Sequence, residues 1–449
     1  MKKYPKYFPT KIEWIGDVPE NWSLKTLRRI TKEHRQGYYT EKPYIQEGVK
    51  LVRITDLHSD GSIDYSDMPF VEISETSEKL YRVLDGDFLF PRTGTIGSLG
   101  FVSNPERAVF ASYLIRFRFK PSEILNGFLY YYFMSNAFLD GVFSDLHGGV
   151  VQNIHAENIK NQFIAHPKKI DEQQIIVSFL DYKTGQIDRF ITNRKKQIEL
   201  LKEQKQCVLE KRITEGINPE RGFQKIENLY IEQIPIGWEF KKLAFLSKIT
   251  RLAGYEYTLH WEPKDDGEVI ALRGQNVGFN EFKEIENAER ISIELSLKLN
   301  RSKLYKGDIV FPCVGTVGKA VLIEEDNKYH INQNIAKITP KNDVDGLFLT
   351  LLLNSYYAYH QIIHFNTSDA QPNVLVRDLR RFMIPTPPYE EQKKIAMVIM
   401  KELNSLNALI SKYQKQIDLM QEYRTSLISQ AVTGKIDVRE WQPKNNKVE

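Results

Sequence analysis

The sequence predicts an α+β protein in which two similar mixed α/β domains are separated by two long antiparallel coiled-coil helices, with an internal pseudo-two-fold repeat. Two observations predict this fold: motifs recur in the same order about 219 residues apart, and each copy ends in more than forty residues without proline. The expected order is a first domain at 1–168, a helix at 169–216, a second domain at 217–388 and a second helix at 389–437, with a tail to 449.

The repeat is clearest in GDFLFPRTGTIG at 86–97 and GDIVFPCVGTVG at 307–318, which lie 221 residues apart. Four further motif pairs keep the same order, at 15–27 with 231–243, 51–57 with 270–277, 151–176 with 370–395, and 213–218 with 432–437. The period is far too long for a solenoid, so two whole domain-sized units have been duplicated.

Each domain is expected to mix strands and helices. FLFP at 88–91 and IVFP at 309–312 are typical of buried strands that end at a proline and a glycine-rich turn. The apolar segments at 127–138 and 346–360 predict helices.

The long helices are predicted from a heptad pattern, in which apolar residues recur at alternating spacings of four and three. The expected seam residues are Leu180, Ile187, Ile191, Ile198, Leu201 and Val208 in the first helix, and Ile399, Leu403, Leu406, Ile410, Ile417, Met420 and Leu427 in the second. The first helix also has polar seam positions, at Thr184, Arg194, Lys205 and Arg212. Neither seam would hold well alone, so we expect the two helices to pair with each other.

Composition excludes several classes of protein. The net charge is only +4, from 62 basic and 58 acidic residues, so any basic surface must come from an uneven distribution of charge. The two cysteines, Cys207 and Cys313, have no metal-ligand spacing and indicate neither a disulfide framework nor a zinc cluster. No apolar run is long enough to span a bilayer or act as a signal peptide, so we expect a cytoplasmic protein.

No motif makes a convincing catalytic site. TPPY at 386–389 has threonine where the amino-methyltransferase loop needs Asp or Asn, and GTVGK at 315–319 lacks the spacing of a phosphate-binding loop. Asp188 and 203–205 (EQK) could form a nuclease motif of the Asp…Glu-x-Lys type, but all of them lie on one heptad helix, so a structural role is the better interpretation. His155, His260 and His330 have no ligand spacing.

Two domains held apart by rigid helices suit a bipartite target on duplex DNA. Two readers on one face of the duplex must be separated by about one helical turn, ~34–36 Å, or a multiple of it. A helix of about 43 residues would be ~64 Å long and would fix such a gap, which a flexible linker would not.

These motifs resemble the specificity subunit of type I DNA restriction-modification enzymes. The resemblance rests on the paired GD-[FI]-[LV]-FP-x-x-GT-[IV]-G motifs, on the P…EQ…I start of each long helix and on LISQAVTGKID at 427–437, and it covers nearly the whole chain. It implies two target recognition domains that each read half of an asymmetric DNA site, and helices that act as a spacer. The first helix start, PKKIDEQ at 167–173, departs from the second, PPYEEQ at 387–392, which leaves open whether both helices dock a partner equally.

The resemblance also implies partners and cofactors. Two modification subunits, which are adenine-N6 methyltransferases using S-adenosylmethionine, would pack on the helices. Restriction subunits with ATP-dependent translocase and nuclease activity, which need ATP and Mg, would join them. It implies no catalytic residue, metal or cofactor in this chain.

Candidate base-reading residues follow from the repeat, because equivalent loop positions that differ between the domains are the better specificity candidates. The candidates for DNA binding are Arg53, Arg92, Thr93, Tyr113, Gln152 and Asn153 in the first domain, and Arg273, Gln275, Gln333, Asn334, Gln371 and Asn373 in the second. Arg53 and Arg273 occur in both copies and are expected to be structural or to contact phosphate. The scaffold candidates shared by both copies are Gly94, Thr95, Gly315 and Thr316. Gln and Asn can read adenine, and Arg can read guanine.

Two alternatives stay open at this point. The chain could be the recognition partner of a fused restriction-methylation enzyme, which neighbouring reading frames would distinguish. It could instead be a coiled-coil scaffold whose two domains bind proteins, and that reading predicts no DNA affinity.

Overall fold

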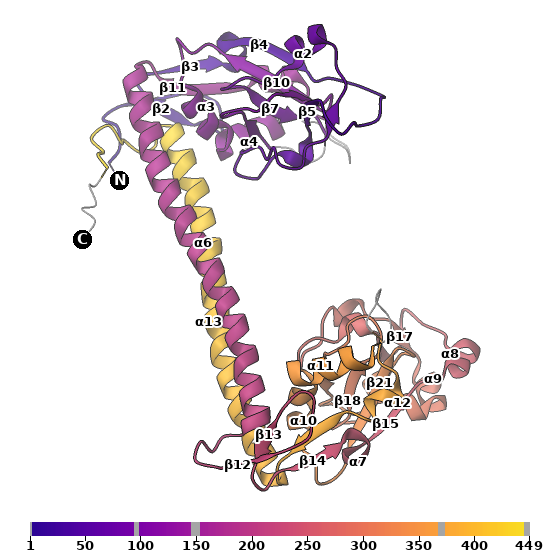
Figure 1. Cartoon of the computed structure of the whole chain (residues 1–449). Coiled ribbons are helices and arrows are strands. Elements are labelled where there is room, and N and C mark those ends of the chain that lie inside the picture. Colours follow the sequence, from indigo (N-terminus) through magenta and orange to yellow (C-terminus); the bar gives the residue numbers. More distant parts are fainter. Residues whose placement is uncertain (1, 94–97, 145–152, 367–372, 444–449) are drawn as a thin grey trace. The chain divides into compact units, whose positions relative to one another are not determined.

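The computed structural model describes residues 2–93, 98–144, 153–366 and 373–443. The chain divides into two compact units, Met1–Lys195 with Gln414–Glu449 and Lys196–Tyr413. Each unit therefore contains one mixed domain and one half of each long helix (Figure 1). The two units are called unit 1 and unit 2 below.

Unit 1 is built on a four-stranded antiparallel sheet in the order β4-β10-β7-β8. Its strands are β4 (Thr31–Gln36), β10 (Leu114–Phe119), β7 (Phe88–Pro91) and β8 (Gly100–Phe101). A second sheet has the order β6-β5-β9, with β6 (Phe70–Val71), β5 (Val49–Val52) and β9 (Ala108–Phe110). Two antiparallel strand pairs complete the unit, β1 (Tyr7–Pro9) with β2 (Asp17–Pro19), and β3 (Trp22–Thr26) with β11 (Phe163–Pro167).

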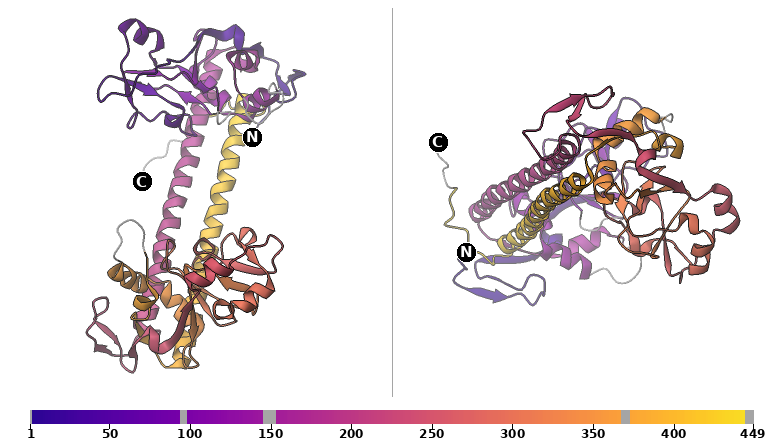
Figure 2. Two further views of the ribbon diagram at one scale, coloured as in Figure 1. Left: turned by 90° about the vertical axis from the view of Figure 1, so that its right-hand side faces the viewer. Right: turned by 90° about the horizontal axis from the view of Figure 1, so that it is seen from below.

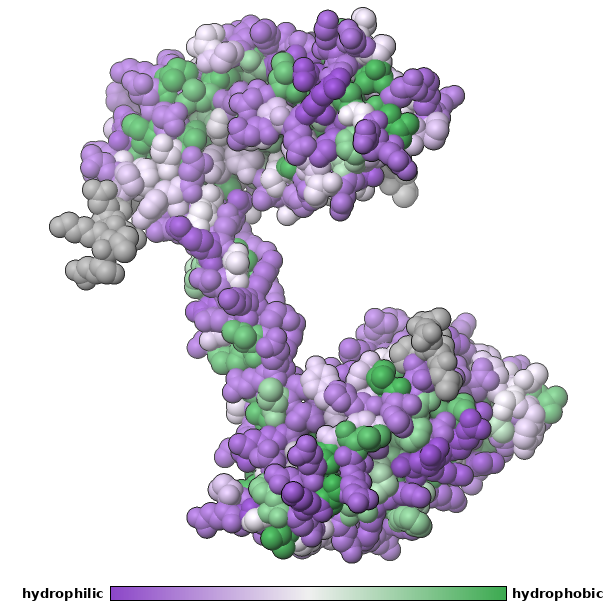
Figure 3. Space-filling view, viewed as in Figure 1, coloured by the Kyte–Doolittle hydropathy of each residue, from purple (hydrophilic) through white to green (hydrophobic). Residues whose placement is uncertain are grey.

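The helices of unit 1 connect these strands. They are α1 (Leu27–Ile30), η1 (Ile54–Asp56), α2 (Glu75–Tyr81), α3 (Asn126–Phe133), α4 (Asn136–Ser144), α5 (Ala156–Asn161) and the first part of α6 (Ile170–Glu215). In the space-filling view, the visible face of unit 1 is mostly hydrophilic, with hydrophobic residues scattered through it (Figure 3).

Unit 2 repeats this topology strand for strand. Its sheets have the orders β15-β21-β18-β19 and β17-β16-β20, and β12 pairs with β13 and β14 with β22. The strands are β12 (Phe223–Lys225), β13 (Gln233–Pro235), β14 (Glu239–Lys242), β15 (Ser247–Arg251), β16 (Val269–Leu272), β17 (Arg290–Ile291), β18 (Ile309–Pro312), β19 (Val321–Leu322), β20 (Tyr329–Ile331), β21 (Ile335–Pro340) and β22 (Met383–Thr386). The pairings β5–β9 and β16–β20 are both parallel, whereas the other strand pairs named here are antiparallel. The duplication therefore includes this parallel pairing.

The helices of unit 2 follow the same order with three additions. They are α7 (Leu243–Leu246), α8 (Gly254–His260), η2 (Gly274–Asn276), η3 (Ile285–Asn287), α9 (Ile293–Lys298), η4 (Asn300–Ser302), α10 (Gly346–Leu353), α11 (Tyr356–Phe365), α12 (Val376–Leu379) and α13 (Tyr389–Val432). The additions are α8, η3 and η4, because the corresponding segments of unit 1, all within the described residues, contain no helix.

The apolar segments at 127–138 and 346–360 are helical, but each is divided into two short helices. The break falls at Ser135 in unit 1, and at Asn354 and Ser355 in unit 2. The Ser135 and Ser355 hydroxyls donate to Tyr132 O and Leu352 O, at 2.6 and 2.5 Å. These hydroxyls satisfy carbonyls at the end of the first helix, a contact that hydrophobic periodicity does not reveal.

A long helix caps the second short helix in each unit. In unit 2, the Glu210 carboxylate of α6 accepts the backbone N–H groups of Tyr356 and Tyr357 at the start of α11. In unit 1, the Ser429 hydroxyl of α13 accepts Asn136 N at 3.0 Å. These contacts join each globular part to a long helix through otherwise unpaired N–H groups.

The Glu-Gln pair at the start of each long helix has a structural explanation. Glu172 accepts Trp22 Nε1 at 2.9 Å, and Glu391 accepts Trp238 Nε1 at 3.2 Å. The following Gln173 accepts Leu125 N and donates to Pro167 O, each at 2.9 Å, and Gln392 makes the corresponding bonds in unit 2. The motif therefore locks the first turn of the helix onto the domain that precedes it.

The long helices run antiparallel within each unit (Figure 2). In unit 2, Arg212 of α6 pairs with Glu402 of α13 at 2.8 Å, and Lys205 donates to Asn407 at 2.6 Å. In unit 1, Asp188 pairs with Arg424 at 3.0 Å. Residues of higher number in α6 therefore contact residues of lower number in α13, as expected for antiparallel helices.

The structure buries the heptad positions. The seam residues that are at most 8% exposed are Leu180, Ile187, Ile191, Ile198, Ile399, Leu403, Ile417 and Leu427. The half-buried ones are Leu201, Val208, Leu406, Ile410 and Met420. The polar position Arg212 is held by the ion pair with Glu402, which explains how a charged residue is accommodated there.

Candidate nucleic-acid interface

Four loops of unit 2 meet at one end of its sheets. Cys313, which follows β18, donates its N–H to Asn334 O at 2.8 Å, and its carbonyl accepts Val374 N at 2.8 Å. Asn332 N donates to Leu272 O at 3.1 Å, which attaches the turn between β20 and β21 to the end of β16. The loop cluster of unit 2 is defined here as residues 273–277, 313–318, 332–334 and 373–375.

The same loops meet in unit 1 through equivalent hydrogen bonds. Arg92 N donates to Tyr113 O at 2.8 Å, Ile154 N donates to Arg92 O at 2.8 Å, and Ala111 N donates to Val52 O at 2.9 Å. The loop cluster of unit 1 is residues 53–57, 92–93, 111–113 and 153–155. The structure thus brings the described candidates of each domain, which are dispersed along the sequence, into one place per unit.

The two repeated arginines hold the loops in shape. Arg53 donates from Nη2 and Nε to the Asp56 carboxylate, at 2.7 and 3.1 Å, and this hydrogen bonding raises the pKa of Arg53. Arg273 instead donates from Nη2 to Glu289 Oε1 at 2.8 Å, with about half of its side chain exposed. Both side chains keep donor capacity toward solvent, so contact with a phosphate is compatible with the scaffold role.

The remaining described candidates differ in exposure. Tyr113 is 60% exposed, which makes it the most accessible aromatic candidate of the cluster. The other exposed candidates are Asn153, Gln275, Asn334 and Asn373, and the half-buried ones are Arg92, Thr93 and Gln333. The predicted residues Gly94, Thr95, Gln152 and Gln371 lie outside the described residues.

The turn that contains Gly315 and Gly318 connects β18 to β19, as the sequence predicted for a tight turn rather than a nucleotide cradle. Both glycines have positive φ, at 79° and 80°. A Cβ on Gly318 would also lie 3.0 Å from the Tyr359 ring. Glycine is therefore required by backbone conformation and by space.

Sequence reasoning missed a tyrosine-lined hollow in unit 1. It has a volume of about 480 Å³ and is lined by Tyr38, Tyr39 and Tyr44 together with Arg53 and Tyr113. Tyr39 and Tyr44 are 65% and 58% exposed. Exposed aromatic rings beside a positive side chain suit stacking on bases or sugars, so this hollow extends the candidate interface.

Unit 2 has aromatic residues in the equivalent segment, arranged differently. Helix α8 presents Tyr255, which is 67% exposed, and Tyr257 stacks on Trp261 with ring centroids 5.2 Å apart. Trp261 Nε1 donates to Glu289 at 3.3 Å, the residue that also binds Arg273. The signal that could have found both segments is aromatic density at equivalent positions, in GYYTEKPY at 37–44 and GYEYTLHW at 254–261.

A second set of missed residues is a lysine cluster beside the loops of unit 2. Lys205 of α6 and Lys319 each lie over the Phe279 ring, at 5.8 and 5.9 Å from its centroid. Burial and the neighbouring charges of Lys283 and Lys205 lower the pKa of Lys319. Burial also lowers the pKa of Lys205, against the opposing effect of Glu281. Cationic side chains held this close together favour the binding of an anion between them.

The enzyme-like motifs have structural roles. Thr386, at the end of β22, is 8% exposed and donates its hydroxyl to Ile384 O at 2.9 Å, so TPPY is the structural link between β22 and α13. Cys313 is buried, and burial raises its pKa to about 11. Among the described residues, no group of three or more His, Cys, Asp or Glu could hold a metal ion. No helix in the described ranges is long and apolar enough to cross a membrane.

Two units of one fold, each with its own exposed loop cluster, define a class of proteins with paired recognition modules. The family model for the type I restriction modification DNA specificity domain matches the chain twice, at residues 19–200 and 235–419. The chain therefore belongs to the type I restriction-modification DNA specificity family, as the motifs predicted.

Individual relatives span nearly the whole chain. The type I restriction enzyme MjaVIII specificity subunit of Methanocaldococcus jannaschii is 24% identical over 445 residues, which cover 94% of both proteins. The EcoBI specificity subunit of Escherichia coli is 23% identical over 410 residues, covering 89% of this chain and 82% of that protein.

Two solved structures share the fold. One, from work on complex assembly and conformational transition of the type I R-M system, has a TM-score of 0.71 at 14% identity and covers 93% of this chain and 99% of the other. The HsdS subunit from Thermoanaerobacter tengcongensis has a TM-score of 0.54 at 15% identity, with coverages of 93% and 98%. The predicted duplicated fold is confirmed.

Proposed function

We propose that this specificity subunit recognises an asymmetric bipartite DNA site, with each loop cluster reading one half. The observation that carries the proposal is that equivalent backbone hydrogen bonds assemble a loop cluster in each unit, while the side chains at equivalent positions of the two clusters differ. Tyr113 in unit 1 has Asn334 as its counterpart in unit 2, and Arg92 has Cys313. One scaffold with different side chains suits two different half-sites.

The long helices would set the gap between the half-sites and dock the methyltransferase subunits. Each helix carries large apolar side chains that the seam does not cover. They are Leu200, Met397, Leu419 and Tyr423, which are 54%, 62%, 52% and 44% exposed. Exposed apolar residues on a helix that already has a partner favour a further protein contact.

The chain itself would be non-catalytic. In this proposal, S-adenosylmethionine is bound by the methyltransferase partners, and ATP and Mg by restriction partners. The DNA target also implies that the complex acts in the cytoplasm.

The test is to express the chain with its methyltransferase partner and map N6-methyladenine by single-molecule sequencing. We expect a bipartite motif with a fixed gap that disappears when the chain is deleted. Arg92→Ala should alter only one half of the motif and Gln333→Ala only the other, because they lie in different loop clusters. Lys225→Ala, on the exposed strand β12, is the control and should leave both halves unchanged.

Two outcomes of this experiment would contradict the proposed function. If the methyltransferase purifies with the chain and is active but no motif depends on the chain, half-site reading is wrong. If Arg92→Ala and Gln333→Ala both change the same half, the assignment of one half to each unit is wrong.

A further inference from the structure

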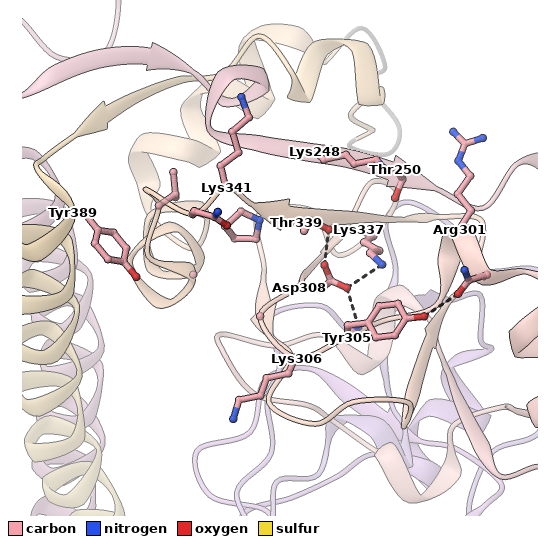
Figure 4. Close-up of a pocket in the computed structure, with 16 residues that line it drawn as sticks. Lys248, Thr250, Arg301, Tyr305, Lys306, Asp308, Lys337, Thr339, Lys341 and Tyr389 are labelled. Atoms are coloured by element: carbon pink, nitrogen blue, oxygen red, sulfur yellow. Dashed lines mark hydrogen bonds and ion pairs between the residues drawn. The ribbon is translucent and has the colours of Figure 1, made fainter.

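Unit 2 contains a basic hollow that the proposed function does not use. It has a volume of about 790 Å³ and lies against β15, β21 and the start of α13. Five cationic residues line it: Lys337, which pairs with Asp308, and around it the four cations Lys248, Arg301, Lys306 and Lys341 (Figure 4). This hollow is called the lysine basin below.

The four cations are not neutralised within the protein. Among the described residues, none of their side chains forms an ion pair. The acid at the floor, Asp308, is already engaged: it pairs with Lys337 at 3.0 Å and accepts Thr339 Oγ1 at 2.5 Å and Tyr305 N at 2.8 Å (Figure 4). Asp308 therefore balances Lys337, and the surrounding cations retain their full charge toward the hollow.

The corresponding surface of unit 1 keeps only one of these four cations, Lys120, and Glu123 pairs with it at 3.9 Å. Lys341 N donates to Leu246 O and Lys120 N to Ile30 O, each at 2.9 Å, which makes Lys341 and Lys120 equivalent. The duplicated GD motif in the same way makes Arg301 equivalent to Leu80, and Lys306 to Asp85.

A further acid of unit 1 strengthens this contrast. Glu33 of β4 lies opposite Arg118, and Lys248 of β15 lies opposite Thr339, the residue equivalent to Arg118. An acid that pairs with Arg116 and Arg118 thus stands in unit 1 where unit 2 has Lys248. Two units with one fold thus differ in this patch, so the cations of unit 2 are not needed for folding. The cations repel one another, which costs stability, and folding does not require them. Their presence therefore favours a role in binding an anionic ligand.

The lysine basin is separate from the loop cluster. Strand β18 runs from Ile309, next to Asp308, to Pro312, which enters the loop cluster. The basin and the loop cluster thus lie at opposite ends of this strand, and a ligand in the basin would not occupy the candidate base-reading residues.

We propose that the lysine basin binds phosphate groups. Several separated cations around one open hollow suit a ligand with several negative groups. Arginine and lysine are the usual donors to phosphate oxygens, Arg301 by two parallel hydrogen bonds and the lysines as point charges. Asn300 and Asn342 also line the hollow and add uncharged amide groups.

Two kinds of ligand present several phosphate groups: the backbone of DNA outside the half-site, and a free polyphosphate such as that of a nucleotide. The phosphate site itself does not depend on the proposed DNA-reading function.

The test uses the full chain and inorganic tripolyphosphate, with binding measured by isothermal titration calorimetry. We expect Lys248→Gln combined with Arg301→Gln to weaken binding about tenfold or more, because hydrogen bonds to charged groups are lost. Lys32→Gln combined with Lys120→Gln, which removes two lysines from the corresponding surface of unit 1, is the charge-matched control and should leave the affinity unchanged. Circular dichroism of each variant confirms folding.

A second arm distinguishes the sources and separates this proposal from half-site reading. Duplexes with and without about ten flanking base pairs compete against tripolyphosphate. Competition that needs the flank identifies DNA backbone as the source, and its absence identifies a free polyphosphate. The methylation motif should stay the same in the basin variant. Tripolyphosphate binding that is absent, or equal in the basin and control variants, would overturn the proposal.

Discussion

The C-terminal tail offers a sharp test of how unit 1 is completed. Residues after α13 return to the N-terminal part of the chain: Tyr7 OH donates to Gly434 O at 3.0 Å, Lys435 Nζ to Asp17 O at 2.6 Å, and Asp437 N to Lys2 O at 2.9 Å. Ile436, in the middle of this segment, is 5% exposed. We expect Ile436→Ala to destabilise unit 1 specifically.

The magnitude follows from the burial of that side chain. Truncation of a buried isoleucine to alanine costs about 2–5 kcal/mol, and the low end applies where the surroundings can relax into the space. The tail lies near the end of the chain, so we expect about 2 kcal/mol, which is a roughly 30-fold change in an opening equilibrium. Ile217→Ala is the matched variant, because Ile217 is partly buried against the core of unit 2.

Native-state hydrogen exchange followed by mass spectrometry measures each unit separately. In Ile436→Ala, amides of β3 and β11 should exchange about 30-fold faster while those of β14 and β22 keep their rates. Ile217→Ala should show the reverse pattern. An equal change in both units, or no change in β3 and β11, would refute the view that the tail stabilises unit 1 locally.

Three further predictions follow. Lys319→Gln should weaken binding to duplexes of any sequence and lower the slope of log affinity against log salt by about one, as titrations at several salt concentrations would show, whereas Lys225→Gln should not. Burial holds the pKa of His330 below its usual 6.5, so the free energy of unfolding should fall as the pH drops through 6.5 toward that lower pKa. Unfolding curves of His330→Val at several pH values should lack this part of the pH dependence. An unchanged pH dependence in the variant would contradict the prediction. Arg116→Met should destabilise unit 1 by about 3–5 kcal/mol in denaturant unfolding, because Arg116 is 1% exposed and its loss leaves the buried Asp87 with fewer partners; a change below about 1 kcal/mol would show that Arg118 suffices.

Much of the fold followed from the order of motifs. The FLFP and IVFP strands, the duplicated domains and the antiparallel pairing of helices within each unit match what the periodicities predicted. The division of the two apolar segments into paired short helices was not predictable, because it depends on serine hydroxyls and on caps supplied by Glu210 and Ser429 from the long helices. Such contacts join residues far apart in the sequence and leave no local pattern.

The candidate interface shows the same limit. Comparing the repeats identified Arg92, Tyr113 and Gln333 as differing loop positions, but it did not identify the tyrosines of residues 37–44 or the Lys205 and Lys319 pair. Lys205 belongs to a heptad seam by sequence, and it lies over Phe279, just beyond the loop cluster, only because α6 passes Phe279 within unit 2.

The sequence by itself determined the family, the duplication, the positions of β7 and β18 and the starts of the two long helices, because each depends on local patterns of apolar residues, glycine and proline. Only the tertiary structure decided which side chains share a surface. It assembled each loop cluster from four separate segments, and it placed four cations around the lysine basin in a chain whose net charge is only +4. The physical reason is that charge and hydrogen-bonding capacity act through space, whereas periodicity acts along the chain.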